Sequence, residues 1–434
     1  MKKIIALLLA AALVMSLAAC SSSDNSESSS KSDSEAESSA DSETVETSET
    51  GFTPALDTSI ESTLYFVGSY GNFEALDQVA LDFKEYYPNV EVVYTKLDDY
   101  NNDLANRFST GNEVDLFMST WWDTDYTYAK NIINNAEDLT SAGIDFSGIN
   151  SELLSSGNVD GAQLVVPIYM QSWGYMVNLD IFKSAGIDVP TDYQSLLSAC
   201  EKLTEAGYEK PIYMNSGLYG RSFIGYYMEQ KIAGSDDAAA LENTLTRMDE
   251  LVSLGYVNDE GDTLDDSYEA QILRFFEGDV PMEPISLNNF SGTAKREAKS
   301  EAFTENPFEY AYIPAPYGDT AGTAYIDQLS TVYIGVYKDS TQKDLANEFL
   351  RFMLTDDEMS TLSTIKNMPT TNAAGLDNFT YLKSADLFYN SAEGIAVFDE
   401  EVALNVLNAF KADSDHSEMY DMQTDYLENG FGWD

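Results

Sequence analysis

Cysteine and histidine are almost absent from this chain. Its 434 residues include two cysteines, Cys20 and Cys200, and one histidine, His416. A Ser-His-Asp triad or a metal site with two histidines would have only this one imidazole to use. The sequence also contains no glycine-rich phosphate loop, no Cys/His cluster and no dinucleotide-binding fingerprint. We therefore expect neither a bound metal nor a cofactor.

Positive charge is scarce as well. The chain has 23 Lys and Arg against 74 Asp and Glu, a formal net charge of -51. Such a surface repels phosphate backbones, which argues against nucleic-acid binding. It is also repelled by an anionic membrane, so any membrane attachment requires a covalent or spanning anchor. A cationic solute such as a polyamine would be attracted, and that alternative stays open.

The N-terminus has the features of an export signal. Lys2 and Lys3 precede the almost wholly apolar stretch 4–17, and Leu-Ala-Ala-Cys ends at Cys20. The apolar stretch is too short to span a ~30 Å hydrocarbon core comfortably. The last four residues resemble a bacterial lipobox, which implies a signal peptide over 1–20 and a diacylglyceryl group on Cys20. The other interpretation is an ordinary cleaved signal with an incidental cysteine.

Residues 21–58 are predicted to be a disordered tether. They consist mostly of Ser, Glu, Asp and Thr, with few large apolar side chains. Such a segment buries too little surface to offset its chain entropy. A flexible chain of this length spans roughly 35 Å, and repulsion between like charges extends it further.

The remainder of the chain alternates between strand and helix patterns, which predicts an α/β fold. The apolar run 64–67 is typical of a buried parallel strand, and apolar residues then recur at helical spacing up to Phe83. Further strands are expected over 90–94, 114–118, 164–168 and 331–337. Thr191 is the predicted N-cap of a helix whose apolar stripe includes Cys200, which we interpret as a core residue rather than a reactive thiol.

Several segments in order resemble the extracellular solute-binding proteins of ABC importers, in particular the carbohydrate-binding group that includes maltose-binding protein. The segments that carry the resemblance are FKEYYPNVEV at 83–92, DGAQLVVP at 160–167, VNLDIFKSAGI at 177–187, FEGDVPM at 276–282, and IGV with ANEFL at 334–336 and 346–350.

The resemblance implies a two-lobe α/β fold with a ligand cleft between the lobes. It places 59–168 and 280–330 in the N-terminal lobe, and 169–279 and 331–434 in the C-terminal lobe. It further implies a protein without catalytic activity that captures a carbohydrate, most simply an oligosaccharide. The partners would be ABC permease subunits, and the location the outer face of the bacterial cell membrane, with the lipid on Cys20 as the anchor. We expect a monomer.

Candidate ligand residues follow the predicted strands, because open α/β sheets bind ligands at the carboxyl ends of their strands. Aromatic rings can stack on the apolar faces of a sugar, while amide, hydroxyl and carboxylate groups bond its hydroxyls. The predicted ligand-binding residues are Tyr70, Trp121, Trp122, Asp123, Tyr169, Trp173, Ser216, Tyr219, Asn288, Asn289, Asp327 and Gln328.

Simpler interpretations exist for each of these residues. Aromatic side chains at strand ends often fill cores, and Asp123 could cap a following helix. Two carboxylates about 5–10 Å apart would suffice for a glycoside hydrolase, so a lipid-anchored hydrolase is the rival function. The acidic residues Asp259, Asp262, Asp265 and Asp266 lack EF-hand spacing, and we interpret them as a solvated loop rather than a calcium site. His416 is likewise expected in an exposed loop.

Overall fold

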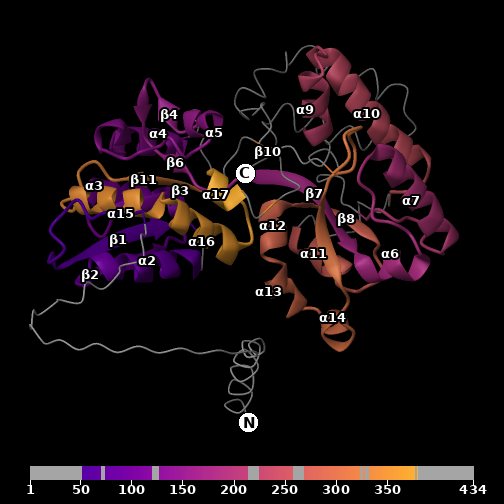
Figure 1. Ribbon diagram of the computed structural model, residues 1–434, viewed down its shortest axis with the longest axis horizontal. Coiled ribbons are helices and arrows are strands. Elements are labelled where there is room, and N and C mark those ends of the chain that lie inside the picture. Colours follow the sequence, from indigo (N-terminus) through magenta and orange to yellow (C-terminus); the bar gives the residue numbers. More distant parts are fainter. Residues whose placement is uncertain are drawn as a thin grey trace, which may run out of the picture. The chain divides into compact units, whose positions relative to one another are not determined.

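A computed structural model describes residues 51–69, 74–119, 127–213, 224–257, 268–322, 326–327, 332–376 and 379 (Figure 1). All of them belong to the compact unit Thr50–Asp434, which is distinct from the unit Met1–Glu49. Nowhere in these ranges is there a helix long and apolar enough to cross a membrane.

The first sheet has five strands in the order β2-β1-β3-β11-β6. Strand β1 is parallel to β2 and β3, whereas β11 is antiparallel to both β3 and β6. The strands are β1 (Ser62–Gly68), β2 (Val90–Lys96), β3 (Leu116–Ser119), β6 (Val166–Pro167) and β11 (Tyr333–Val336).

Helices cover both faces of the first sheet, as expected for strands that are apolar throughout. Phe66 and Met118 face one core and Val67 and Phe117 the other, because successive side chains of a strand alternate. The first core is covered by α2 (Glu74–Tyr86), α15 (Lys343–Met353) and α16 (Asp356–Lys366), and the second by α3 (Tyr100–Thr110) and α4 (Thr127–Asn135).

The second sheet is built around β7 (Gln171–Asn178), which pairs antiparallel with β8 (Met282–Ser286) on one edge. The other edge of β7 pairs with β9 (Tyr310–Pro314) and β10 (Ile326–Asp327). One face packs on α6 (Leu179–Ala185), α7 (Tyr193–Glu205), α9 (Ile224–Ile232) and α10 (Asp237–Ser253); the other is lined by α11 (Tyr268–Phe275) and α12 (Leu287–Ser291).

The remaining elements are short. They are η1 (Leu139–Ser141), α5 (Ser151–Ser155), β4 (Asn158–Val159), β5 (Ala162–Gln163), α13 (Thr293–Glu297), α14 (Glu301–Glu305) and α17 (Ala373–Leu376).

The pairing of the strands corrects the predicted division of the chain. Strands β8, β9 and β10 pair with β7, so 280–330 does not join the first sheet. Strand β11 pairs with β3 and β6, and α15 and α16 pack on the first core, so 332–376 does not join the second. The physical reason is that short apolar strands carry no local signal for their partner, which only the long-range pairing selects.

The fold begins earlier than the predicted end of the tether at residue 58. Phe52 is buried and its ring contacts Tyr86 and Phe352 edge-on. Arg351 lies over the same ring at 4.3 Å and donates to the carbonyl of Thr53 at 2.7 Å. The amides of Ala55 and Leu56 donate to Glu348 and to the Tyr87 hydroxyl. Residues 52–56 are therefore part of the packed body, because one aromatic side chain and three backbone hydrogen bonds offset the entropy of ordering them.

Two local predictions can be compared with the structure. Cys200 is wholly buried in the stripe of α7, and burial raises the pKa of its thiol to about 12, which confirms the core assignment. The cap of the same helix is shifted by one residue. Asp192, not Thr191, accepts from the amide of Ser195, and the Ser195 hydroxyl accepts from the amide of Asp192.

Glu358 in α16 provides a pH test of the packing between α2 and α16. Its side chain is buried, and burial together with the nearby Asp82, Asp357 and Glu85 raises its pKa to about 8. The folded protein therefore keeps a proton on Glu358 that the unfolded chain releases near the ordinary pKa of a glutamate. The free energy of unfolding consequently falls as the pH rises from that ordinary pKa toward 8.

We predict that Glu358→Gln removes this loss. Between pH 5 and pH 8.5 the wild type should lose about 1–3 kcal/mol more unfolding free energy than the variant, as expected for a buried polar group forced to ionise. Urea denaturation at both pH values measures the difference. Glu305→Gln changes an exposed carboxylate and is the control for net charge. Identical pH profiles for wild type and Glu358→Gln would contradict the assignment.

Candidate functional site

Among the elements that the structure describes, two connections carry the chain between the sheets, and both attach at the same end of the first sheet. Residues 168–170 join β6 to β7, and residues 328–332 join β10 to β11. Tyr333 at the start of β11 pairs with Ser119 at the end of β3 and with Pro167 at the end of β6. The carboxyl ends of β3 and β6 and the start of β11 therefore lie together at the end of the sheet where both crossing segments attach.

The same edge of the first sheet carries polar groups. Ser69 follows β1, and its buried hydroxyl has no hydrogen-bond partner among the described residues. Gly68 precedes it, where a Cβ would lie 2.4 Å from the Tyr94 hydroxyl, so a larger residue would displace the Tyr94 side chain. The predicted residues Tyr70, Trp121, Trp122 and Asp123 follow β1 and β3 in the chain, but they lie outside the described residues.

In the second sheet, the start of β7 and the end of β8 form the corresponding polar region. Trp173 pairs with Ser286, and Asp327 of β10 pairs with Gln171. Since residues two apart on a strand share a face, Gln171 and Trp173 lie on the same side of the sheet. Asn288 follows two residues after Ser286, within the first turn of α12.

The side chain of Gln171 links the start of β7 to the first turn of α12. Its side-chain oxygen accepts from the amides of Ser172 and Asn288, both at 3.2 Å. The Ser286 hydroxyl caps α12 by accepting from the amide of Asn289, also at 3.2 Å. The first turn of α12 is therefore fixed to the start of β7, which defines the position of Asn288 and Asn289.

Two buried polar atoms in this region have no bonding partner within the described part of the chain. They are the indole nitrogen of Trp173 and the side-chain oxygen of Asn288. Leaving such a group unpaired costs about 1–3 kcal/mol, so an unpaired donor and acceptor near each other call for an explanation. One donor and one acceptor suit a ligand hydroxyl, which can both accept and donate.

A buried carboxylic acid lies on the other face of β8. Glu283 alternates with the Ser286 face and pairs with Met176, and it is completely buried. Burial raises its pKa well above the usual value, and Arg274 and Gln271 of α11 oppose this only in part. Because Glu283 projects from the opposite face of β8, its carboxyl group is not part of the Trp173 face.

The structure brings together some of the predicted residues and not others. Trp173, Asn288, Asn289 and the backbone of Asp327 lie at one end of the second sheet. Tyr169 does not fit a ligand contact, because its ring is wholly buried in the core of the first sheet and its hydroxyl donates to the carbonyl of Leu362 at 3.2 Å. Ser216, Tyr219 and Gln328 lie outside the described residues, as do His416 and the acidic loop 259–266.

Sequence reasoning missed Gln171. Its position two residues before Trp173, on the same strand face, is the signal that could have identified it. Within the described ranges, no cluster of three or more His, Cys, Asp or Glu side chains could hold a metal ion.

The arrangement of two sheets joined by crossing segments, with polar groups at the joined edges, defines a two-lobe binding protein. The family described as "Bacterial extracellular solute-binding protein" matches residues 68–360, and the chain belongs to it. The family is one of substrate-binding proteins that act outside the cell.

Solved structures share this two-lobe fold. The GacH receptor of Streptomyces glaucescens, studied unliganded and with acarbose, is 16% identical, with 86% of this chain and 99% of that chain covered and a TM-score of 0.59. The sugar-binding protein MalE of Xanthomonas citri is 13% identical, with 85% and 97% covered and a TM-score of 0.59. An ABC substrate-binding protein of Listeria monocytogenes in complex with cycloalternan is 18% identical, with 86% and 100% covered and a TM-score of 0.55.

We predict that Gln171→Ala lowers the unfolding free energy by about 1–3 kcal/mol, because the buried amide of Ser172 and the partly buried amide of Asn288 lose their acceptor. Gln163→Ala is the matched control, since Gln163 is equally buried and its amide donates to the carbonyls of Leu154 and Val165 at 2.9 and 2.7 Å. Denaturant titration should give a similar loss for both variants. A loss below about 0.5 kcal/mol for Gln171→Ala would contradict the role assigned to its side-chain oxygen.

Proposed function

We propose that this protein captures a neutral carbohydrate, most simply an oligosaccharide, and delivers it to the permease subunits of an ABC importer. The observation that carries the proposal is the polar region of the second sheet, where an indole and an amide each have a buried polar atom left unpaired by the described residues. A sugar hydroxyl bonds both kinds of atom, and an indole ring stacks on the C–H face of a pyranose.

The ligands of similar proteins support a sugar. The solved relatives include complexes with acarbose and with cycloalternan, and a protein described as sugar-binding. The uncharged side chains of Gln171, Trp173, Ser286 and Asn288 suit a neutral sugar, and a carboxylate such as that of Asp327 would accept hydrogen bonds from its hydroxyls. We assign Gln171, Trp173, Asn288, Asn289 and Asp327 to the ligand site.

The remaining predicted residues complete the site in this proposal. Tyr70, Trp121, Trp122 and Asp123 follow strands that end at the edge where the chain crosses between the sheets. Gln328 lies in one of the crossing segments, and Ser216 and Tyr219 lie in the segment that comes before α9 in the chain. Ligand contacts from both sheets would favour a closed arrangement of the lobes, which the permease would then recognise.

The proposal includes a lipid anchor on Cys20 and a tether that ends near residue 51. A single acyl chain binds a membrane only marginally, with K on the order of 10⁴ M⁻¹, whereas two chains give lasting attachment. The tether would hold the monomeric binding protein close to its permease on the outer face of the membrane.

We predict that isothermal titration calorimetry detects binding of at least one of maltotriose, raffinose and cycloalternan. Trp173→Phe and Gln171→Ala should weaken that binding tenfold or more, whereas Gln163→Ala should bind as the wild type does. Heat from a polyamine such as spermidine, with none from the three sugars, would overturn the carbohydrate assignment. Release of a chromophore from aryl glycosides would instead identify a hydrolase.

We also predict that Cys20→Ser abolishes membrane attachment when the full chain is expressed in a Gram-positive host. Wild-type protein should partition into the detergent phase of Triton X-114 and the variant into the aqueous phase. Cys200→Ser, which changes the other cysteine, is the control and should partition as the wild type does. Detergent partitioning of Cys20→Ser would refute the lipid anchor.

A further inference from the structure

Arg247 of α10 is enclosed by two tyrosine rings. The central carbon of its guanidinium lies 4.4 Å from the ring centroid of Tyr193 and 3.9 Å from that of Tyr226. Tyr193 begins α7 and Tyr226 lies in α9, so one side chain joins three helices. A cation partly removed from water between aromatic faces is held more firmly than one on an open surface.

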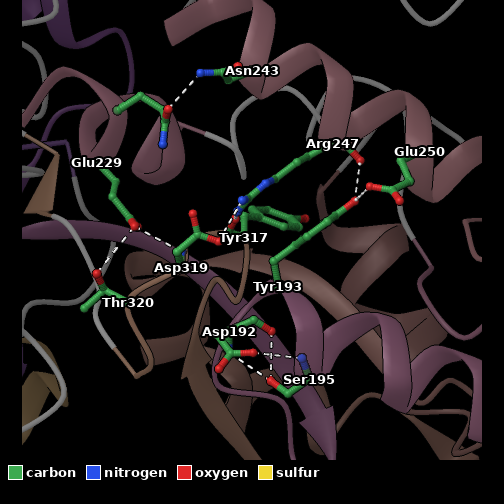
Figure 2. A network of polar contacts seen from close by, with 11 residues as sticks. Asp192, Tyr193, Ser195, Glu229, Asn243, Arg247, Glu250, Tyr317, Asp319 and Thr320 are labelled. Carbon is green, nitrogen blue, oxygen red and sulfur yellow. Dashed lines mark hydrogen bonds and ion pairs between the residues drawn. The ribbon is translucent and has the colours of Figure 1, made fainter. Parts of the chain in front are cut away.

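The same guanidinium reaches the loop that follows β9. One terminal nitrogen donates to the carbonyl of Tyr317, and the other pairs with the Asp319 carboxylate at 2.8 Å (Figure 2). The fixed fork of an arginine suits two such acceptors at once, which the single ammonium of a lysine does not.

Glu229 of α9 binds the adjoining part of the loop. Its carboxylate accepts from the amide of Asp319 at 3.0 Å and from the hydroxyl of Thr320 at 3.4 Å (Figure 2). The loop is thus held from α10 and α9 together. We call Arg247, Asp319 and Glu229 the loop clamp.

The loop is also tied to α7 and to β7. The amide of Tyr193 donates to the carbonyl of Gly318 at 3.0 Å, and the amide of Gly322 donates to the carbonyl of Thr191 at 2.7 Å. The Tyr317 ring is buried, and its hydroxyl is bonded to the hydroxyl of Tyr175 in β7. Tyr175 lies two residues from Trp173 on the same strand face.

This loop precedes, in the chain, a strand of the proposed ligand site. Residues 317–322 precede β10, whose Asp327 pairs with Gln171. Helix α9, which supplies Glu229 and Tyr226, follows the segment that contains Ser216 and Tyr219. The loop clamp therefore holds α9 against the loop that precedes β10, although none of its three members belongs to the polar region of β7 and β8.

We infer that Arg247 is a positioning residue of the ligand site, which fixes β10 and α9 relative to β7 and thereby sets the affinity for the sugar. The inference rests on the proposed function. Without Arg247 the loop loses its ion pair through Asp319 and the hydrogen bond to the carbonyl of Tyr317. The guanidinium that lies between Tyr193 of α7 and Tyr226 of α9 is lost as well. The elements that carry Asp327 would then sample other positions, and ordering them would oppose binding.

The test compares Arg247→Met with Arg351→Met. Arg351 is the matched control because it also covers an aromatic ring, pairs with a carboxylate (Glu348, 2.9 Å) and bonds a backbone carbonyl, but it lies on the first core. Maltotriose, raffinose and cycloalternan are titrated at 15 °C into each variant after its folding is confirmed by thermal melting. Hydrogen exchange of peptides that cover β10 is measured without sugar.

We expect Arg247→Met to weaken sugar binding at least tenfold and to speed exchange in β10, while Arg351→Met changes neither. The sugar affinity and the β10 exchange rate of Arg247→Lys should lie between those of the wild type and Arg247→Met. Wild-type affinity or unchanged β10 exchange in folded Arg247→Met would overturn the inference, as would an equal loss of affinity in Arg351→Met. If Arg247→Met does not fold, Asp319→Asn and Glu229→Gln, which leave the tyrosine rings in place, decide by the same criteria.

The two proposals fail in different ways. A wild-type protein that binds none of the three sugars refutes the carbohydrate function, whatever the variants do. A wild type that binds sugar and an Arg247→Met protein that binds it equally well refute only the positioning role. The exchange of β10 measures the loop clamp without any ligand.

Discussion

The second sheet depends on strand β7, because every other strand of that sheet pairs with it. All eight of its residues are buried, and it is paired along both edges. At Gly174 a Cβ would lie 2.2 Å from the carbonyl oxygen of Ile313 and 2.4 Å from the ring of Tyr312. Glycine is therefore needed there for β9 and its tyrosine to approach, and the register of β9 on β7 follows from that contact.

That register also determines where polar groups meet. With Trp173 opposite Ser286, the helix that Ser286 caps begins beside Gln171, whose side-chain oxygen takes the amide of Asn288. A shift of one residue would turn Gln171 and Trp173 to the opposite face. The polar region is thus a consequence of strand pairing, and the unpaired indole nitrogen and amide oxygen are held where the fold places them. Rigid elements that hold such groups reduce the entropy that a ligand must overcome.

Much of the fold could be predicted from local patterns, because apolar periodicity reports burial directly. The strand at 64–67, the helix ending near Phe83 and the buried Cys200 all follow from it. Which sheet receives β8 or β11 could not be predicted, since both are short apolar runs and their partners lie far away in sequence. The early start of the fold depends on the single ring of Phe52, which a composition of Ser and Glu around it conceals.

For the candidate site, the sequence identified the residue types better than their roles. Trp173 and Asn288 were predicted as ligand residues from their chemistry, and the structure places both beside the polar end of β7. Tyr169 has the same chemistry but points into a core, because it lies in a crossing segment whose backbone pairs with Thr370. Gln171 looked unremarkable because its function as an acceptor appears only once α12 is placed against β7.

The scarcity of positive charge gives the arginines a structural role that lysine could not fill. The chain has six arginines, and the five in the described ranges, Arg107, Arg247, Arg274, Arg296 and Arg351, each pair with a carboxylate. Three of these five also lie over aromatic rings. Exposed ion pairs contribute little to stability, but a planar guanidinium that stacks on a ring and bonds a backbone carbonyl joins elements distant in sequence. Arg351 does so where residues 52–53 pack on α15, and Arg247 where the loop before β10 meets three helices. In so acidic a protein, cations placed at such junctions bring segments together that charge repulsion would otherwise separate.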